Sequence, residues 1–302
     1  MSQKRRKRRL IGSSLVLALV GAVLPAGASD FGGAHRISSW TFSFTTYGWA
    51  SWVTGDLTVK GRPLEVDVSP DALIDALDWS GLPVWMSYAE ARNGKLTLFN
   101  DIVYSKLAGS ADFARSRQGL LTTQSLAGSV ESEYQQLVIE VGAAYEVWSN
   151  GSMSSPQSTA VDLLAGGRYW RQEVEVSADL AATIAAGGNI ADLEVSGGRV
   201  VARSGSVDWF DPFIGARLRH QIVPGQRVML RGDVGGFGVG SDFSWQAMAT
   251  YDWQMLVRTG YAIDAYLGYR ALYVDYHRGE GTTRYEYDVL QHGPVLGLTI
   301  RF

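Results

Sequence analysis

The sequence predicts an all-β chain that folds as a transmembrane up-and-down antiparallel β-barrel of about ten strands. Three observations support this fold class. Runs of β-branched and aromatic residues recur with turn signals between them, apolar and polar residues alternate within the runs, and the polar face combines arginine, aspartate and glycine. A period of two places one kind of side chain on each face of a strand. Twelve and eight strands are the alternative counts.

The first residues have the pattern of a secretory signal peptide. The basic run KRRKRR (4–9) precedes the apolar run LIGSSLVLALVGAVL, and Pro25 and the small residues AGA (26–28) follow it. We expect cleavage after Ala28, which leaves residues 29–302 as a single barrel domain. A nuclear-type basic cluster or a single membrane anchor is the alternative interpretation of residues 1–28.

Charge and cysteine content exclude two classes of function. Residues 1–28 carry six of the 27 basic residues and no acidic residue, so the mature chain has 21 basic and 30 acidic residues. An acidic exported chain lacks the basic patch that nucleic-acid binding requires, so no nucleic-acid partner is expected. The sequence contains no cysteine, which excludes disulfide and thiolate chemistry.

The spacing of aromatic residues favours a membrane barrel over a soluble β-sandwich. In YAIDAYLGYRALY (261–273) the odd positions are apolar, and the even positions include Asp264 and Arg270. Tyr261 and Tyr273 are twelve residues apart on one face, which is about 28 Å along the membrane normal at ~3.3 Å per residue and ~45° tilt. That length matches the hydrocarbon thickness of a bilayer. A periplasmic or secreted sandwich, which shows similar alternation, is the alternative.

Turn signals divide the chain into ten expected strands. They cover residues 38–52, 82–92, 95–107, 132–148, 158–173, 205–221, 225–237, 241–256, 260–276 and 285–302. Short turns at RNGK, SNGS, VPGQ and VRTG are expected on the periplasmic side with both termini. Long connections over 53–81, 108–131, 174–204 and 277–284 are expected outside. The first of these could add a hairpin, which gives the count of twelve, and SPDALIDAL within it is typical of a short helix capped by serine.

Charged residues on the inward faces are the most informative candidate site. The predicted lumen set is Asp162, Arg168, Arg217, Arg219, Arg231, Asp233, Asp264, Arg270 and Arg301, with Glu90 and Glu140 expected to join it. These side chains could line an arginine-rich selective pore, or they could pair and fill the lumen. Eight-stranded barrels are filled, and open channels occur at sixteen to eighteen strands, so about ten strands favours the filled interior.

Other motifs give weaker functional signals. Asp275 and His277 share one face at the upper end of a strand, where a lipid hydrolase would place its site, but no neighbouring serine motif supplies a nucleophile. A polar pair at the rim is therefore the favoured interpretation. The glycines of 235–240 lack the lysine of a phosphate-binding loop and predict a tight strand connection. No residue cluster has metal-ligand spacing, and no cofactor is expected.

Several segments resemble a family of uncharacterised Gram-negative outer-membrane β-barrel proteins. They are WTFSFTTYGW (40–49), EARNGK (90–95), DPFIGAR (211–217), GDVGGFGVGSDFSWQ (232–246) and GPVLGLTIRF (293–302). The resemblance implies location in the outer membrane, with the lipid bilayer and lipopolysaccharide as surroundings. It also implies that the last strand, through Leu296, Leu298, Ile300 and Phe302, is the signal recognised by the barrel-assembly machinery. It implies no activity.

The sequence therefore favours a structural barrel, or at most a passive small-solute pore, in preference to an enzyme. One alternative is an outer-leaflet lipid hydrolase that uses His277 and Asp275. Another is a surface receptor or adhesin that acts through loops 108–131 and 174–204.

Overall fold

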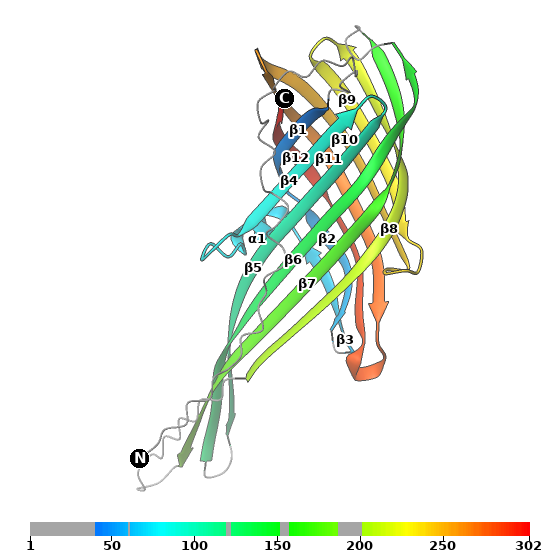
Figure 1. Cartoon of the computed structure of the whole chain (residues 1–302). Helices are drawn as coiled ribbons and strands as arrows, with labels where there is room; N and C mark the ends of the chain where they lie inside the picture. The colour runs from blue at the N-terminus through cyan, green and yellow to red at the C-terminus, as the bar shows by residue number, and fades with distance from the viewer. Residues whose placement is uncertain (1–39, 60, 119–121, 152–156, 187–200) are drawn as a thin grey trace, which may run out of the picture. The chain divides into compact units, whose positions relative to one another are not determined.

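The computed structural model describes residues 40–59, 61–118, 122–151, 157–186 and 201–302 (Figure 1). The predicted signal peptide lies outside the described residues. The described strands are β1 (Thr41–Trp49), β2 (Trp52–Val59), β3 (Arg62–Val68), β4 (Val84–Asn93), β5 (Leu96–Gln118), β6 (Thr122–Asn150), β7 (Ser158–Ala186), β8 (Val201–Val223), β9 (Gln226–Gly236), β10 (Phe243–Arg258), β11 (Tyr261–Arg278) and β12 (Tyr285–Arg301). Two short helices, α1 (Pro70–Asp75) and the 3-10 turn η1 (Gly281–Thr283), complete the described elements.

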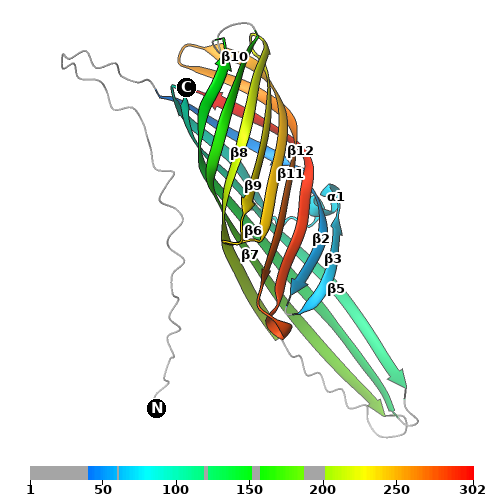
Figure 2. The same ribbon diagram turned by 90° about the vertical axis from the view of Figure 1, so that its right-hand side faces the viewer.

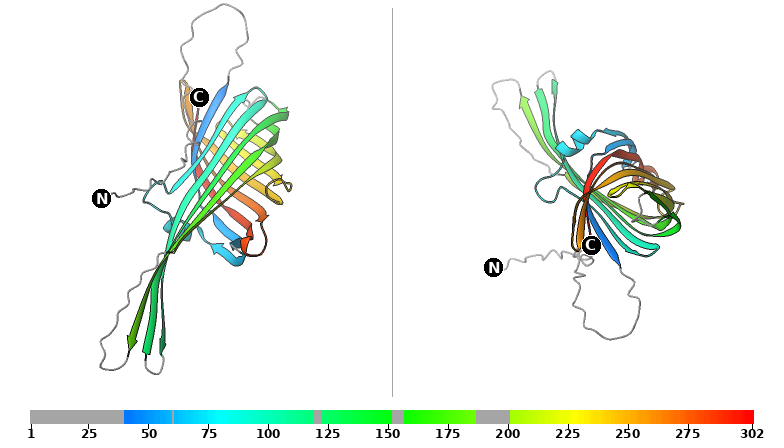
Figure 3. Two further views of the ribbon diagram at one scale, coloured as in Figure 1. Left: turned by 60° about the horizontal axis from the view of Figure 1, so that its bottom comes forward. Right: turned by 90° about the horizontal axis from the view of Figure 1, so that it is seen from above.

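Ten of the described strands form a closed antiparallel ring. The order is β1-β4-β5-β6-β7-β8-β9-β10-β11-β12, and β12 pairs back onto β1 (Figure 3, right). Paired residues can be followed from strand to strand once around the ring, starting at Val53 of β2. The path ends at Thr41 of β1, twelve residues earlier in the chain. A stagger of that size across ten strands tilts them by about 40° from the barrel axis. The predicted barrel and its count of ten are confirmed.

The segment 53–81 forms a hairpin without widening the ring. β1 and β2 both pair with β12, one after the other along its length. Val295–Arg301 of β12 pair with β1, and Tyr285–His292 pair with β2. β3 then returns along β2. The hairpin expected in this segment is therefore present, but the twelve-stranded ring that it would have implied is wrong.

Helix α1 follows this hairpin, in the connection between β3 and β4. Ser69 occupies the N-cap position, but its side chain makes no capping hydrogen bond. The chain after the helix is held to β5, where the backbone amide of Asp78 donates to the carbonyl of Lys106 at 3.0 Å. Neither helix of the described chain has the length and apolar character needed to cross a membrane.

Two of the expected outer loops are strands over most of their length. β5 continues to Gln118 and β6 begins at Thr122, and β7 and β8 similarly extend into the segment predicted as the loop 174–204. Figures 2 and 3 show β5, β6 and β7 continuing together beyond the ring. The loop predictions were wrong because backbone pairing persists well beyond the ring. In β7 the sequence alternation continues as well, with Val174, Val176 and Leu180 at every second position. The segment 277–284 is a short connection that contains η1.

The four short turns were placed correctly. Gly94, Gly151, Gly225 and Gly260 all have a positive φ, between 58° and 91°. This is the left-handed backbone region, which glycine enters without steric cost. Because strand direction alternates around the ring, these turns lie at the same end as the start of β1 and the end of β12; this end is called the terminal end below.

The barrel is apolar outside and charged inside. Leu163, Ile214, Leu267 and Leu298 on its outer face are each about half exposed. Aromatic pairs lie on this face near both ends. They are Phe42–Phe302 and Tyr251–Trp253 at the terminal end, and Trp52–His292 and Trp245–Tyr273 at the opposite end. Small residues such as Ala247 and Ala249 separate the two belts along β10. The apolar residues of the alternating strands thus lie outside, and the charged residues of the same strands are buried inside.

Candidate functional site

An inner layer of four charged side chains crosses the middle of the lumen. Arg168 donates to Glu140 at 2.7 Å and to Asp233 at 2.9 Å, and Arg231 donates to the same two carboxylates at 2.5 and 2.9 Å. All four side chains are at most 4% exposed. Each charge therefore has two opposite charges as neighbours, which is what removal from water requires.

Two phenylalanine rings enclose this inner layer. The guanidinium carbon of Arg231 lies 5.0 Å from the Phe99 ring centre and 5.6 Å from that of Phe213, and Arg168 lies 5.3 Å from Phe213. Both rings point into the lumen, where cation–π contacts add to the ion pairs. The space between the strands at this level is thus occupied by side chains.

A second charged cluster lies between the inner layer and the terminal end. Arg217 and Arg219 both donate to Asp162, each at 2.8 Å from Nε, and Arg217 also pairs with Glu90. Arg219 donates to Glu146 at 3.0 Å. On another part of the wall, Arg270 pairs with Asp101 at 2.8 Å, and Arg301 pairs with Asp264 at 2.7 Å.

All nine predicted lumen residues and both expected additions are therefore in ion pairs. Three charged partners were not predicted: Arg92, Asp101 and Glu146. Glu146 shares the face of Glu140, so extending the alternation by six residues would have found it. Asp101 was missed because its neighbours on that face, Phe99 and Val103, are apolar residues buried inside the barrel.

An aromatic cluster fills the lumen on the other side of the inner layer. Trp209 stacks on Tyr276 with ring centres 4.1 Å apart, and Trp170 stacks on Trp209 at 5.4 Å. Tyr287 contacts both tryptophans at 6.2–6.3 Å. Together with Leu272 and its neighbouring valines, these buried rings form an apolar core inside the barrel. The sequence did not predict this core.

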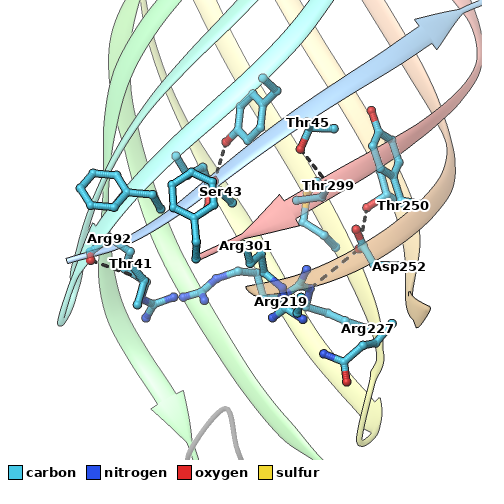
Figure 4. A pocket seen from close by; sticks show the side chains of 18 of the residues that line it. Thr41, Ser43, Thr45, Arg92, Arg219, Arg227, Thr250, Asp252, Thr299 and Arg301 are labelled. Atoms are coloured by element: carbon cyan, nitrogen blue, oxygen red, sulfur yellow. Dashed lines mark hydrogen bonds and ion pairs between the residues drawn. The ribbon is translucent and has the colours of Figure 1, made fainter. Parts of the chain in front are cut away.

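A cavity of about 840 Å³ occupies the terminal end of the lumen. Its floor contains the Arg217–Glu90 and Arg270–Asp101 pairs. Figure 4 shows its wall, with arginine and threonine side chains from several strands directed into one space. The inner layer and the aromatic cluster lie beyond the floor, so the cavity is closed at its deep end.

Asp275 and His277 lie on the outer face of the opposite rim, as their positions in the strand predict. His277 Nδ1 lies 2.8 Å from the Asp242 carboxylate, and the backbone amide of Asp242 donates to the Asp275 carbonyl at 2.9 Å. The carboxylates and imidazole of these three residues lie within 4.8 Å of one another, close enough to hold a metal ion. Asp242 was missed because it lies in the connection just before β10, 33 residues away from Asp275 in the sequence.

This rim cluster provides an acid–imidazole pair without a nucleophile. In the part of the chain that the structure describes, the polar contact found for the His277 ring is with Asp242, and no hydroxyl contacts it. Hydrolysis through a covalent intermediate needs such a hydroxyl within hydrogen-bond reach. The geometry therefore matches the polar pair at the rim that the sequence favours.

The glycine-rich segment is a tight connection between β9 and β10, as predicted. Asp211, fully buried on β8, accepts from the backbone amide of Ser241 at 2.7 Å and from the Trp209 indole at 3.3 Å. The turn lies so close to β8 that a Cβ on Gly240 would be 2.3 Å from the Phe210 carbonyl oxygen. Asp211 thus ties the turn to the aromatic cluster.

The proposed assembly-signal residues lie on the outer face of β12. Leu296, Leu298, Ile300 and Phe302 are all exposed there, and β1 pairs with this part of the strand. The amide of Phe302 donates to the Phe42 carbonyl at 2.9 Å, which joins the last strand to the first.

No known protein family matches the chain, and no curated protein matches it. Solved structures of outer-membrane proteins do align with it. Ail, the attachment invasion locus protein of Yersinia pestis, aligns at 9% identity and a TM-score of 0.30 over 88% of this chain and 100% of Ail. The outer membrane protease OmpT of Escherichia coli aligns at 6% identity and a TM-score of 0.36 over 88% and 97%. A FadL homologue of Pseudomonas aeruginosa aligns at 6% and 0.26 over 87% and 90%. At these values the alignments carry no argument about activity, and the fold rests on the chain's own strand pairing.

Proposed function

We propose that the chain is an outer-membrane β-barrel with a structural role, whose lumen is blocked beyond the cavity by its own side chains and does not conduct. The observation that carries this proposal is the buried network Arg168–Glu140–Arg231–Asp233 in the middle of a closed ring. The aromatic cluster on one side of it adds a second obstruction. An open path for ions would have to break both layers.

The membrane location is supported by the distribution of apolar residues. A soluble barrel buries its apolar face and exposes its charges, whereas this barrel exposes leucine and isoleucine and buries arginine and aspartate. Exposed apolar residues in a continuous band between aromatic belts are typical of a surface in contact with lipid. We propose the outer membrane because closed barrels satisfy every backbone hydrogen bond within the bilayer.

The decisive experiment is a conductance measurement in planar lipid bilayers across a salt series. Mature protein is refolded into lipid, and its folded state is verified by heat-modifiable gel mobility before each recording. We expect no reproducible current steps from folded barrel. Steps with anion preference would show that arginine side chains line an open path, and would overturn the filled lumen in favour of a passive pore.

The orientation is tested separately with single cysteines, because the chain has none of its own. Lys95 lies in an exposed turn at the terminal end, and Ser206 is exposed on β8 beyond the opposite rim. We expect a membrane-impermeant maleimide to label Ser206→Cys in intact cells, and Lys95→Cys only after the outer membrane is permeabilised. The reverse pattern would place the termini outside the cell.

The two alternatives have their own tests. A lipid hydrolase at the rim requires hydrolysis that His277→Ala abolishes while the barrel stays folded. A receptor or adhesin requires that shortening the extension of β5–β8 removes binding to a surface and leaves the barrel folded.

A further inference from the structure

We infer that the cavity at the terminal end is a binding site for a small amphiphilic anion: one carboxylate, sulfonate or phosphate group on an apolar body. Its volume of about 840 Å³ lies within the range of small-molecule sites. The site goes beyond the proposed structural role, and it rests on the residues that line the cavity and not on a closed lumen. The ligand class follows from where the lining charges are already paired and where they are not.

The deep part of the cavity offers no unpaired charge to a ligand. Arg270 pairs with Asp101, and the Tyr47 hydroxyl donates to the same carboxylate at 2.6 Å. Arg270 is 2% exposed and Asp101 is 6% exposed, so their hydrogen bonds are made within the protein. An ion placed there would compete with an existing pair and gain little.

Apolar and aromatic side chains lie at the same depth. Met248 of β10 lines the cavity in register with Arg270, and Val295 of β12 is buried at the floor. Tyr266 of β11 lines the cavity four residues nearer the opening than Arg270. Methionine adapts its shape to different apolar bodies, and its sulfur makes favourable contacts with aromatic rings. The deep part therefore suits the uncharged portion of a ligand.

The cations with incomplete pairing lie nearer the opening. Arg227 Nε is 3.8 Å from the Asp252 carboxylate, beyond hydrogen-bond distance, and Asp252 already accepts from Thr250 at 3.2 Å (Figure 4). Arg258 donates to the carbonyl of Val257 at 3.1 Å, and the described contacts give it no carboxylate partner. Both arginines line the cavity. An anionic group at the opening can approach these arginines without displacing a strong pair.

Depth and charge together select the ligand. Arg227 of β9 is in register with Asp252 of β10, and Met248 lies four residues deeper than Asp252 on β10. A ligand with its anionic group at the opening and its apolar body inward meets a suitable group at each level. A neutral molecule leaves the two arginines unused, and an inorganic anion leaves the apolar part of the cavity unfilled.

The test is isothermal titration calorimetry on barrel in lipid nanodiscs, with the heat of empty nanodiscs subtracted. The probes are naphthalene-1-sulfonate, the uncharged naphthalene-1-sulfonamide, and inorganic phosphate. We expect saturable binding of the sulfonate, at least tenfold weaker binding of the sulfonamide, and no resolved heat from phosphate. Decanoate, an alkyl carboxylate of the kind that membranes supply, distinguishes a lipid-derived ligand from a soluble aromatic one by its relative affinity.

Variants assign the binding to the cavity. Arg227→Gln combined with Arg258→Gln should weaken sulfonate binding about tenfold, and Met248→Trp, which fills the deep part, should abolish it. Arg171→Gln is the matched control, because Arg171 is exposed and paired with Glu173 outside the cavity. Heat-modifiable mobility verifies that each variant is folded.

Two results would overturn the inference. One is the absence of saturable heat from folded wild-type barrel. The other is equal affinity in the wild type, the double arginine variant and Met248→Trp, which would indicate partition into lipid only. Conductance measured on the same samples tests the proposed function independently, because a barrel that conducts could still bind the sulfonate, and a silent barrel could fail to bind it.

Discussion

The inner layer of the lumen and the outer rim both hold closely spaced polar pairs, but in opposite environments. In the inner layer, Arg168 and Arg231 share two carboxylates and all four groups are inaccessible to solvent. At the rim, His277 and Asp242 lie just as close together, at 2.8 Å, but both side chains are more than half exposed. Water screens the rim pair and is absent from the inner layer, so equal distances imply very different energies.

The comparison separates geometry from energetic importance. A buried ion pair contributes little net stability compared with a well-packed apolar pair, but removal of one partner leaves the other charge buried and unpaired. An exposed pair loses little when one partner is removed, because water replaces it. The inner layer is therefore the more sensitive region, and the predictions below run from the largest expected effect to the smallest.

The largest effect is expected for Asp233→Ala. Asp233 accepts from Arg168, Arg231 and Gln246, so its removal leaves two buried guanidinium groups short of a partner. We expect the free energy of unfolding in lipid vesicles to fall by about 3–5 kcal/mol, measured by urea denaturation. Arg217→Ala should act in the same direction, because Asp162 and Glu90 both depend on it.

The control for this prediction is Glu173→Ala. Glu173 pairs with Arg171 at 3.2 Å, but both side chains are well exposed. We expect its effect to lie within about 0.5 kcal/mol of zero. If Asp233→Ala behaved like this control, and heat-modified gel mobility of Arg217→Ala were also unchanged, the paired interior would not be what stabilises the barrel.

The fold could be predicted from the sequence because a barrel wall separates two environments, and alternate side chains along each strand face one or the other. In β11, for example, Tyr261 and Tyr273 face outward while Asp264 and Arg270 face inward, and alternation alone assigns them. The end of β7 was missed although Val174, Val176 and Leu180 continue the alternation. The end of β5 could not be predicted, because residues 108–118 lack a clear alternation. Backbone pairing there follows from neighbouring strands that the local sequence does not specify.

The candidate site was predictable in composition but not in its arrangement. The alternation placed Arg168, Arg231 and Asp233 inside, and a ring of ten strands is too narrow to leave them unpaired. The same alternation also assigns Trp170 and Trp209 to the inward face, but it could not show that their rings stack into one core. The cavity depends on side chains from many strands around the ring, and no local spacing records that convergence.

The turn between β9 and β10 joins the rim to the interior and gives the next test. Gly240→Ala would place a Cβ 2.3 Å from the Phe210 carbonyl oxygen and 2.7 Å from the Asp211 carboxylate. We expect this clash to cost about 1–3 kcal/mol. Gly205→Ala is the matched control, because a Cβ there has no atom within 4 Å, and its effect should stay within about 0.5 kcal/mol. Equal urea midpoints for the two variants would show that the turn can move away from β8 without cost.

The smallest effect is expected at the rim, and it depends on pH. Burial raises the pKa of Asp275, and the nearby carboxylates of Asp288 and Asp242 raise it further. A raised folded-state pKa means that protonation of Asp275 favours the folded state. The resulting stabilisation is fully present below the unfolded value of about 3.9 and is lost as the pH rises through the raised pKa.

The urea midpoint of the wild type should fall slightly between about pH 4 and pH 7 as Asp275 becomes charged, and it should fall less in Asp275→Asn. At the upper end of this range the urea midpoint of Asp275→Asn should rise relative to that of the wild type, because the wild-type carboxylate is then charged beside two others. Asp75→Asn, an exposed acid in helix α1, is the control and should leave the pH profile unchanged. If Asp275→Asn instead lowered the midpoint at pH 7, the charged carboxylate would be stabilising the rim. The contrast with the inner layer would then be one of degree, because both regions would depend on charges held close together.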